Sequence, residues 1–171
     1  MRLRSAIAPS PTSPVARDFQ RTKMIIAAAL HVIAALIWVG GFFFILVILR
    51  PASIRIEPPQ RFRLFAKVFQ WFFPWVWGLI AVLLITGYWM LLSGQALSGL
   101  HTDIMQGLGI AMMLLFGHLY HAPYKRFSEA VDEENWAKTN YQANRMRRAI
   151  RWNLLLGLAT AVVATTGRYW S

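Results

Sequence analysis

Four long stretches of this chain contain no charged side chain, and the charged positions lie between them. The charge-free stretches are residues 24–49, 68–102, 104–124 and 152–167. An α-helix needs about 20 mostly apolar residues to cross the hydrocarbon core of a bilayer, and each stretch comes near or exceeds that length. The pattern therefore predicts an all-α fold, a polytopic membrane protein built as a bundle of four transmembrane helices. The predicted spans are about 24–49, 66–92, 102–122 and 150–167.

The first 23 residues differ from the rest, because they are rich in Pro, Ser and basic residues and show no helical apolar period. We expect residues 1–23 to be a disordered tail and residues 24–171 to form one membrane domain. The apolar stretch behind the tail exceeds the roughly 7–15 residues of a signal-peptide core, so it is predicted to remain as a first span or signal anchor. Pro74 predicts a kink in the second span, because proline removes a backbone hydrogen bond. Pro123 is expected to close the third span.

Basic residues predict how the spans are oriented. The connections between spans one and two and between spans three and four together carry twelve of the eighteen Lys and Arg residues, and the opposite face carries six. Loops that stay in the cytoplasm are enriched in Lys and Arg. We therefore expect both connections in the cytoplasm and both termini on the outside. In a bacterial inner membrane, the termini would be periplasmic.

Composition removes several classes of function. The chain is 57% hydrophobic and only 15% charged, which disfavours a soluble enzyme, and its net charge of +11 reflects the basic connections rather than a nucleic-acid surface. The absence of cysteine excludes disulfides, zinc fingers, iron–sulfur clusters and thiolate catalysis within this chain. No nucleophile–base pair, carboxylate dyad or phosphate loop stands out. A binding protein is favoured over an enzyme, and an enzyme would be a haem-dependent membrane oxidoreductase.

Histidines at membrane depth are the first candidates for function, because lipid cannot solvate an ionisable side chain. His31 lies seven residues into the first span and is flanked only by apolar residues. In the predicted topology it can converge near the outer face with Met90, His101 and Met105. Imidazole and thioether ligands select Cu(I) or haem iron over magnesium or calcium. The sequence thus predicts a metal or haem ligand set at this end of the bundle.

His118 and His121 form a second candidate, an i, i+3 pair near the other end of the third span. Residues three apart share a helix face, so the two can chelate one small metal ion, but they cannot be axial ligands on opposite sides of one haem. A second interpretation stays open for all of these residues. A membrane histidine can serve only to hydrogen-bond a neighbouring helix, His121 can be an interfacial residue, and methionine often fills gaps in packing.

Several segments resemble the copper-resistance D (CopD) superfamily of polytopic bacterial inner-membrane proteins. The segments are LHVIAALIWVGG (30–41), RFRLFAKVFQWFFPWVW (61–77), TGYWM (86–90), HTDIMQGLGIAMMLLFGHLYHAP (101–123), IRWNLLLGL (150–158) and GRYW (167–170). The resemblance extends over about 24–170 and fits a short four-helix branch. It implies a role in copper uptake or tolerance.

A related branch, the HemJ-type protoporphyrinogen oxidases, carries haem b and uses a first-helix histidine placed much like His31. That branch also has a characteristic lysine in its third helix, whereas residues 104–124 contain no lysine, which counts against the oxidase activity here.

Three hypotheses follow from these residues and this resemblance. The first is a copper-handling protein in which His31, Met90, His101 and Met105 receive Cu(I) and His118 and His121 form an inner site. The second is a haem-b redox protein with His31 and either His101 or His118 as axial ligands, exchanging electrons with quinone. The third is an accessory membrane subunit without metal. The expected partners are the lipid bilayer, copper or haem, a quinone or a periplasmic copper carrier, and a second copy of the chain in a homo-oligomer; nucleic acid is not expected.

Overall fold

The structure, a computed structural model, describes residues 14–93 and 99–169, and every element within those ranges is helical. Short π-helical turns (η1 and η2) join α-helical segments, and a 3-10 turn (η3) ends the described chain. The elements are α1 (Pro14–Phe43), η1 (Phe44–Leu49), α2 (Arg50–Ala52), α3 (Pro58–Leu92), α4 (Leu100–Leu119), η2 (Tyr120–Tyr124), α5 (Lys125–Asp132), α6 (Trp136–Thr166) and η3 (Gly167–Tyr169). The predicted all-α class is confirmed.

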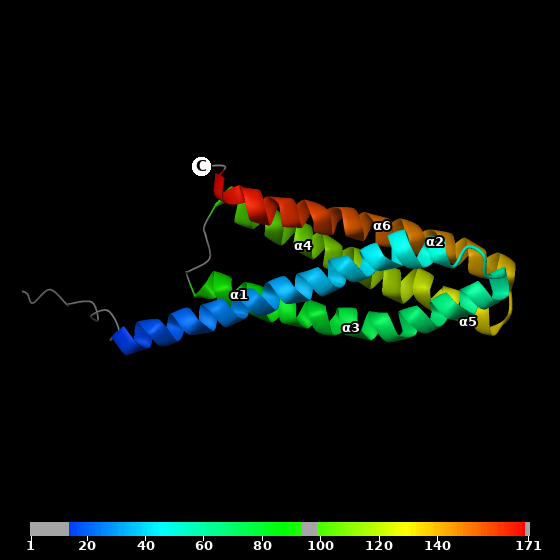
Figure 1. The fold of residues 1–171 in the computed structure, drawn as a ribbon, viewed down its shortest axis with the longest axis horizontal. Helices are drawn as coiled ribbons and strands as arrows, with labels where there is room; N and C mark the ends of the chain where they lie inside the picture. The colour runs from blue at the N-terminus through cyan, green and yellow to red at the C-terminus, as the bar shows by residue number, and fades with distance from the viewer. Residues whose placement is uncertain (1–13, 94–98, 170–171) are drawn as a thin grey trace, which may run out of the picture.

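In the described part of the chain these elements make four helical rods, which form the bundle (Figure 1). The rods are α1 with η1 and α2, α3 alone, α4 with η2 and α5, and α6 alone. Helix α1 packs against α3 and α6, α4 packs against α6, and α5 packs against α6 and α3. The start of α1 and the end of α6 lie at one end of the bundle, which we call the terminal end (residues 14–24, 90–93, 99–102 and 166–169). Helices α2 and α5 lie at the other, which we call the basic end (residues 50–63 and 125–147). Neighbouring rods in sequence are therefore antiparallel.

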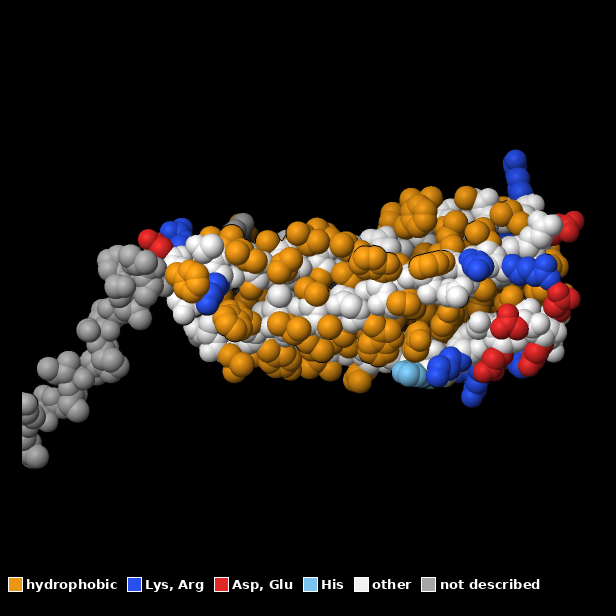
Figure 2. All heavy atoms as spheres, turned by 90° about the horizontal axis from the view of Figure 1, so that it is seen from below, with side chains coloured by type: hydrophobic (Ala, Val, Ile, Leu, Met, Phe, Trp, Pro, Cys, Tyr) orange, Lys and Arg blue, Asp and Glu red, His pale blue; other side chains and the backbone are white. Residues whose placement is uncertain are grey.

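Each rod is long and apolar enough to cross a membrane. The rods hold 36, 35, 33 and 31 residues, and at about 1.5 Å per residue all exceed the roughly 30 Å of a hydrocarbon core. Figure 2 shows hydrophobic side chains over the middle of the molecule and charged side chains at its two ends. Large apolar residues in that middle region face outward, among them Leu36 (67% exposed) and Leu114 (70% exposed). Lipid, rather than water, is the solvent that suits such a surface.

Helix boundaries differ from the sequence expectation at two places. Helix α1 begins at Pro14, so residues 14–23 of the expected tail are helical, while residues 1–13 lie outside the described chain. Proline fits the first turn of a helix, where its missing N–H has no intrahelical partner. The third rod continues through Pro123 into α5. A π-turn is wider than an α-turn, which relieves the clash between the proline ring and a preceding carbonyl.

Aromatic rings fill the centre of the bundle. Phe116 of α4 is fully buried, and its ring centroid lies 6.0 Å from that of Trp38 and 5.4 Å from that of Phe73. Both contacts are edge-to-face, the geometry that aromatic pairs prefer. The cluster connects α1, α3 and α4 at mid-bundle and so sets the positions of the helix segments that lead toward the terminal end.

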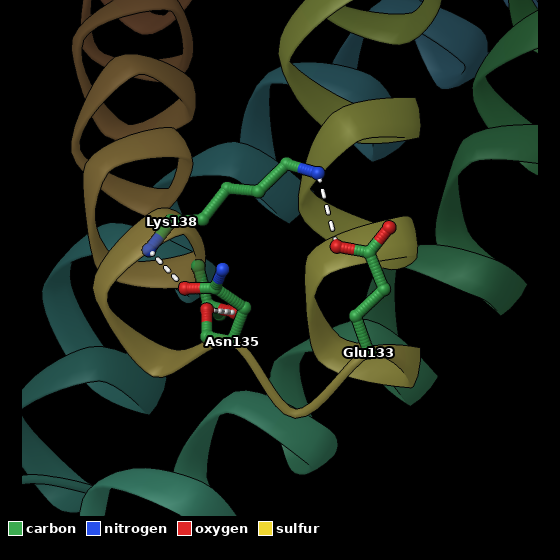
Figure 3. A network of polar contacts seen from close by, with 4 residues as sticks. Glu133, Asn135 and Lys138 are labelled. Atoms are coloured by element: carbon green, nitrogen blue, oxygen red, sulfur yellow. Dashed lines mark hydrogen bonds and ion pairs between the residues drawn. The ribbon is translucent and has the colours of Figure 1, made fainter.

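The connection between α5 and α6 is closed by local hydrogen bonds (Figure 3). The side chain of Asn135 accepts from the backbone N–H of Lys138 at 3.1 Å and caps the start of α6, while Lys138 pairs with Glu133 at 3.0 Å. Helix α5 ends with Glu134 at a φ of 52° and with the N–H of Asn135 bonded to the carbonyl of Ala130 at 3.0 Å. This is a Schellman ending, with glutamate at the position that glycine usually occupies.

Candidate functional site

His31 is held between α1 and α3 by a side-chain hydrogen bond. Its Nδ1 lies 2.8 Å from the hydroxyl oxygen of Thr86. That hydroxyl lies 2.6 Å from the carbonyl oxygen of Val82, which can only accept, so the single hydroxyl hydrogen goes to Val82. With the hydroxyl hydrogen on Val82, Nδ1–H of His31 donates to Thr86. In this tautomer of the imidazole, the lone pair that can bind a metal lies on Nε2.

Gly87, next to Thr86, allows α3 to approach the imidazole closely. A Cβ atom built on Gly87 would lie 3.2 Å from Cε1 of His31, which is tighter than an ordinary van der Waals contact. The ring therefore lies directly against the α3 backbone and is half-buried. Thr86 and Gly87 together hold the ring between α1 and α3.

Two methionines continue the line of His31 toward the terminal end. Met24 lies seven residues before His31 on α1, and Ser93 lies seven residues after Thr86 on α3, with the Ser93 hydroxyl 3.3 Å from the Met24 sulfur. The two helices thus keep one antiparallel register over two turns. Met90 lies four residues after Thr86, about 6 Å further along α3. By this spacing, Met24, Met90 and His31 follow one another along the contact between α1 and α3, the α1–α3 seam, in steps of roughly one helical turn. We call these three residues the ladder.

Met24 did not emerge from the sequence as a candidate. Its signal was its spacing, because residues seven apart on a helix lie on nearly the same face. The residue stands directly after Lys23, at the boundary between the charged tail and the first span. Met24 is the first residue of the predicted span, yet it lies on the same stripe of α1 as His31.

His101 has different neighbours, at the contact between α4 and the end of α6. A Cβ atom built on Gly167 would lie 2.4 Å from the Cβ of His101, so the two backbones approach closely here. Met112 lies on the same stripe of α4 further into the bundle. Its carbonyl accepts from the Asn153 side chain at 3.0 Å, and its Cε lies 3.2 Å from a Cβ atom built on Gly157. The predicted stripe of α4 that holds His101, Met105 and Met112 therefore follows the α4–α6 seam.

The predicted ligands near the outer face therefore lie at two different helix–helix contacts, the α1–α3 seam and the α4–α6 seam. His31 and Met90 belong to the α1–α3 seam, whereas His101 lies at the α4–α6 seam, because α4 packs against α6. Among the residues that the structure describes, no three His, Cys, Asp or Glu side chains are grouped so that they could hold a metal ion. A site of that type is absent from this part of the chain.

The inner pair lies at the junction of α4 and η2. His118 and His121 are both exposed, and the His121 ring lies edge-on to Tyr120 at 5.1 Å and to Trp77 at 6.2 Å between centroids. The change from α- to π-helical winding begins at Tyr120, between the two histidines. Aromatic packing against Tyr120 and Trp77 accounts for the position of the His121 ring.

Comparison with known proteins assigns the chain to a family. A family model described as copper resistance protein D matches residues 66–166, which is more than half of the chain. The chain belongs to the copper-resistance D family. The match begins in α3 and includes Met90, His101 and the inner pair, while α1 with His31 lies before it. No curated protein and no solved structure matched.

Family membership and four membrane-crossing rods together make this a multi-pass membrane protein of a copper-resistance family. The residues present suit the ion that the family name implies. Ligands available in the ladder are an imidazole and thioethers, with no carboxylate among them, and such ligands favour monovalent copper over hard cations.

Proposed function

We propose that this member of the copper-resistance D family takes Cu(I) into the membrane along the α1–α3 seam. The copper ion is the cargo, received near Met24, passed to Met90 and bound by Nε2 of His31. The observation that supports the proposal is the hydrogen bond between His31 and Thr86, because it leaves Nε2 of the ring for a metal and because Thr86 lies one helical turn from Met90 on α3. A histidine that only joined two helices by a hydrogen bond would not require methionines along the same seam.

His101, Met105, His118 and His121 complete the proposal as secondary positions. His101 and Met105 lie near the terminal end on α4 and provide a second group of soft ligands there. The inner pair lies toward the basic end and would receive copper after His31. We further propose a bacterial inner membrane as the location, with the terminal end facing the periplasm, because the basic end carries most of the Lys and Arg residues.

The test begins with the visible spectrum of the full-length protein purified in detergent, with and without dithionite. The proposal predicts a colourless protein that binds Cu(I) in competition with a chromophoric chelator. A Soret band and a reduced α band would instead identify haem b, with His31 and His101 or His118 as candidate axial ligands. Retention of neither copper nor haem would leave the accessory-subunit hypothesis.

Two matched variants locate the copper site. His31→Ala should abolish the tight Cu(I) site, whereas His101→Ala should leave most of the affinity, because His101 belongs to the other seam. Equal losses in the two variants would support a single four-residue cluster rather than the ladder. Wild-type affinity in His31→Ala would contradict the proposal.

The orientation has its own test. Reporter fusions at the two termini should be active on the periplasmic side. A cytoplasmic C-terminus would place the ladder on the wrong side of the membrane for uptake from outside.

A further inference from the structure

A cavity of about 390 Å³ opens at the basic end, far from the ladder. Its apolar part comes from the aromatic face of α3 and from α6, with Phe62, Phe65, Phe69, Met146 and Ile150 among the lining residues. Phe62, Phe69, Met146 and Ile150 are buried. The lining also includes three arginines, Arg50, Arg61 and Arg147. The cavity therefore combines a wide apolar surface with a concentrated positive charge.

The three arginines come from three elements that are far apart in sequence: Arg50 from α2, Arg61 from α3 and Arg147 from α6. Among the described residues, the ion pairs are Arg63 with Glu134 and Lys138 with Glu133, so none of the three cavity arginines has a carboxylate partner there. Arg61 reaches the carbonyl of Ile54 at 3.5 Å, and its guanidinium carbon lies 5.7 Å from the centroid of the Phe62 ring. Arg147 reaches the side chain of Asn144.

Placing three guanidinium groups around one cavity is unfavourable unless an anion neutralises them. Arg147 is partly buried and lies in the positive field of Arg50, Arg61 and Arg151. Like charges at close range repel more strongly where water is partly excluded. Arg50 is exposed, but Arg61 and Arg147 are half-buried, so two of the three guanidinium groups are partly removed from water without a carboxylate partner among the described residues. Convergence on one cavity needs a further reason.

We propose that this cavity binds the phosphate head group of an anionic phospholipid, with the first part of an acyl chain against the phenylalanine surface. A guanidinium donates two parallel hydrogen bonds to a phosphate group, and basic pockets between membrane helices bind anionic head groups. A fully hydrated ion would leave the apolar lining of the cavity without a partner, so it is a poorer occupant than a lipid. The open position at the basic end, where the rods leave the apolar band, matches the depth of a lipid head group.

Native mass spectrometry of the full-length protein tests the proposal with two lipids that share the same acyl chains, phosphatidylglycerol and phosphatidylcholine. The wild type should retain phosphatidylglycerol in preference to phosphatidylcholine. Each arginine near the membrane surface contributes roughly fivefold in affinity. The R50Q/R61Q/R147Q variant should therefore lose the preference by on the order of 100-fold.

The matched control is R55Q/K67Q/R148Q, which removes the same charge from exposed positions outside the cavity lining. It should keep most of the preference, and an equal loss in both variants would overturn the proposal in favour of a general surface charge. Ala143→Phe fills the cavity but retains all arginines, and it should weaken phosphatidylglycerol binding as well. Circular dichroism checks that each variant keeps its helices.

Inorganic phosphate separates a lipid site from a simple anion site. Phosphate at the same concentration should not displace phosphatidylglycerol, because it lacks the acyl chain. Displacement by phosphate, or a wild type that does not discriminate between the two lipids, would contradict the proposal.

Discussion

The α1–α3 and α4–α6 seams both place a histidine against a glycine near the terminal end, yet they are built differently. His31 meets Gly87 through its ring, and its Nδ1 is bonded to Thr86. A Cβ atom built on Gly167 would meet the Cβ of His101 at 2.4 Å and also its ring atoms Cγ and Cδ2, at 2.7 and 3.0 Å. The His31 ring has a hydrogen-bond partner on the neighbouring helix, whereas His101 is placed by close packing against Gly167.

Deeper in the bundle the contrast continues. The α4–α6 seam is held by the buried Asn153, which donates to the carbonyl of Met112, while the α1–α3 seam carries methionine sulfur beside hydroxyl groups. A side chain that bonds a neighbouring backbone stabilises the fold, and a soft ligand with its lone pair available can serve copper. Under the proposed function, the α4–α6 seam mainly stabilises the fold and holds the secondary ligands, whereas the α1–α3 seam carries the tight copper site.

The largest expected effect comes from breaking the α4–α6 seam at Asn153, which is 0% exposed. Asn153→Ala removes the hydrogen bond to Met112 and leaves a small cavity, so the free energy of unfolding should fall by about 2–3 kcal/mol. Thermal unfolding in detergent, followed by circular dichroism, measures this. Asn140→Ala, at an exposed position of the same helix, is the control and should change little. A lower Cu(I) affinity in Asn153→Ala without loss of stability would contradict the division between the seams.

The two glycines give the next contrast. Gly167→Ala places a methyl group 2.4 Å from the Cβ of His101, an atom that cannot move without its helix, and should cost about 2 kcal/mol of unfolding free energy. Gly87→Ala meets only the edge of the His31 ring at 3.2 Å, which can tilt, so it should cost less while disturbing Cu(I) binding. Equal losses of stability in the two variants would show that both seams depend on backbone approach. Gly78→Ala, with open space around it, is the matched control for the alanine itself.

Thr86 allows a test that leaves the fold nearly unchanged. Thr86→Val keeps the side-chain shape but removes the acceptor for His31, so the Cu(I) affinity should fall on the order of tenfold, as for other residues that orient a metal-bound histidine. Thr86→Ser retains the hydroxyl and should retain the affinity. The measurement is a chelator competition on both variants, alongside the midpoint of thermal unfolding. Parallel losses of affinity in the valine and serine variants would refute the role given to the hydroxyl.

The smallest effect is expected far from both seams, at the end of α5. Glu134→Gly removes the backbone strain of a non-glycine residue at positive φ. It also removes an exposed ion pair with Arg63. The free energy of unfolding should rise by about 0.5 kcal/mol, with no change in Cu(I) binding. Glu133→Gly lies one residue earlier in ordinary helical conformation and should lower stability instead. A gain in both variants would point to a cause other than backbone strain.

The four rods could be predicted from the sequence, because a charge-free run of membrane length has few alternative structures. The helical start at Pro14 and the passage through Pro123 could not, since proline is compatible with a first turn and with a π-turn as well as with a helix end. Which rods are neighbours was also hidden, because apolar surfaces in lipid carry no strong periodic signal. Packing of α4 on α6 involves the close approach of Gly167 to His101 and the hydrogen bond of Asn153, while Gly157 meets Val39 of α1 as well as Met112 of α4.

The same limit applied to the candidate site. His31 stood out because it is isolated among apolar residues, and its partner Thr86 could not be identified until the register of α1 against α3 was known. Met24 was missed for the same reason, since its link to Ser93 spans 69 positions in sequence. His101 and Met105 were placed beside His31 by depth alone. Depth along the membrane follows from the sequence, whereas position around the bundle does not.

X-ray absorption at the copper edge of the Cu(I)-loaded, full-length protein tests the ladder most directly. The account predicts a mixed shell of nitrogen and sulfur, with the sulfur contribution lost in Met24→Leu/Met90→Leu and kept in Met113→Leu. A shell without sulfur in the wild type, or one that is unchanged in the double variant, would contradict copper binding along the α1–α3 seam.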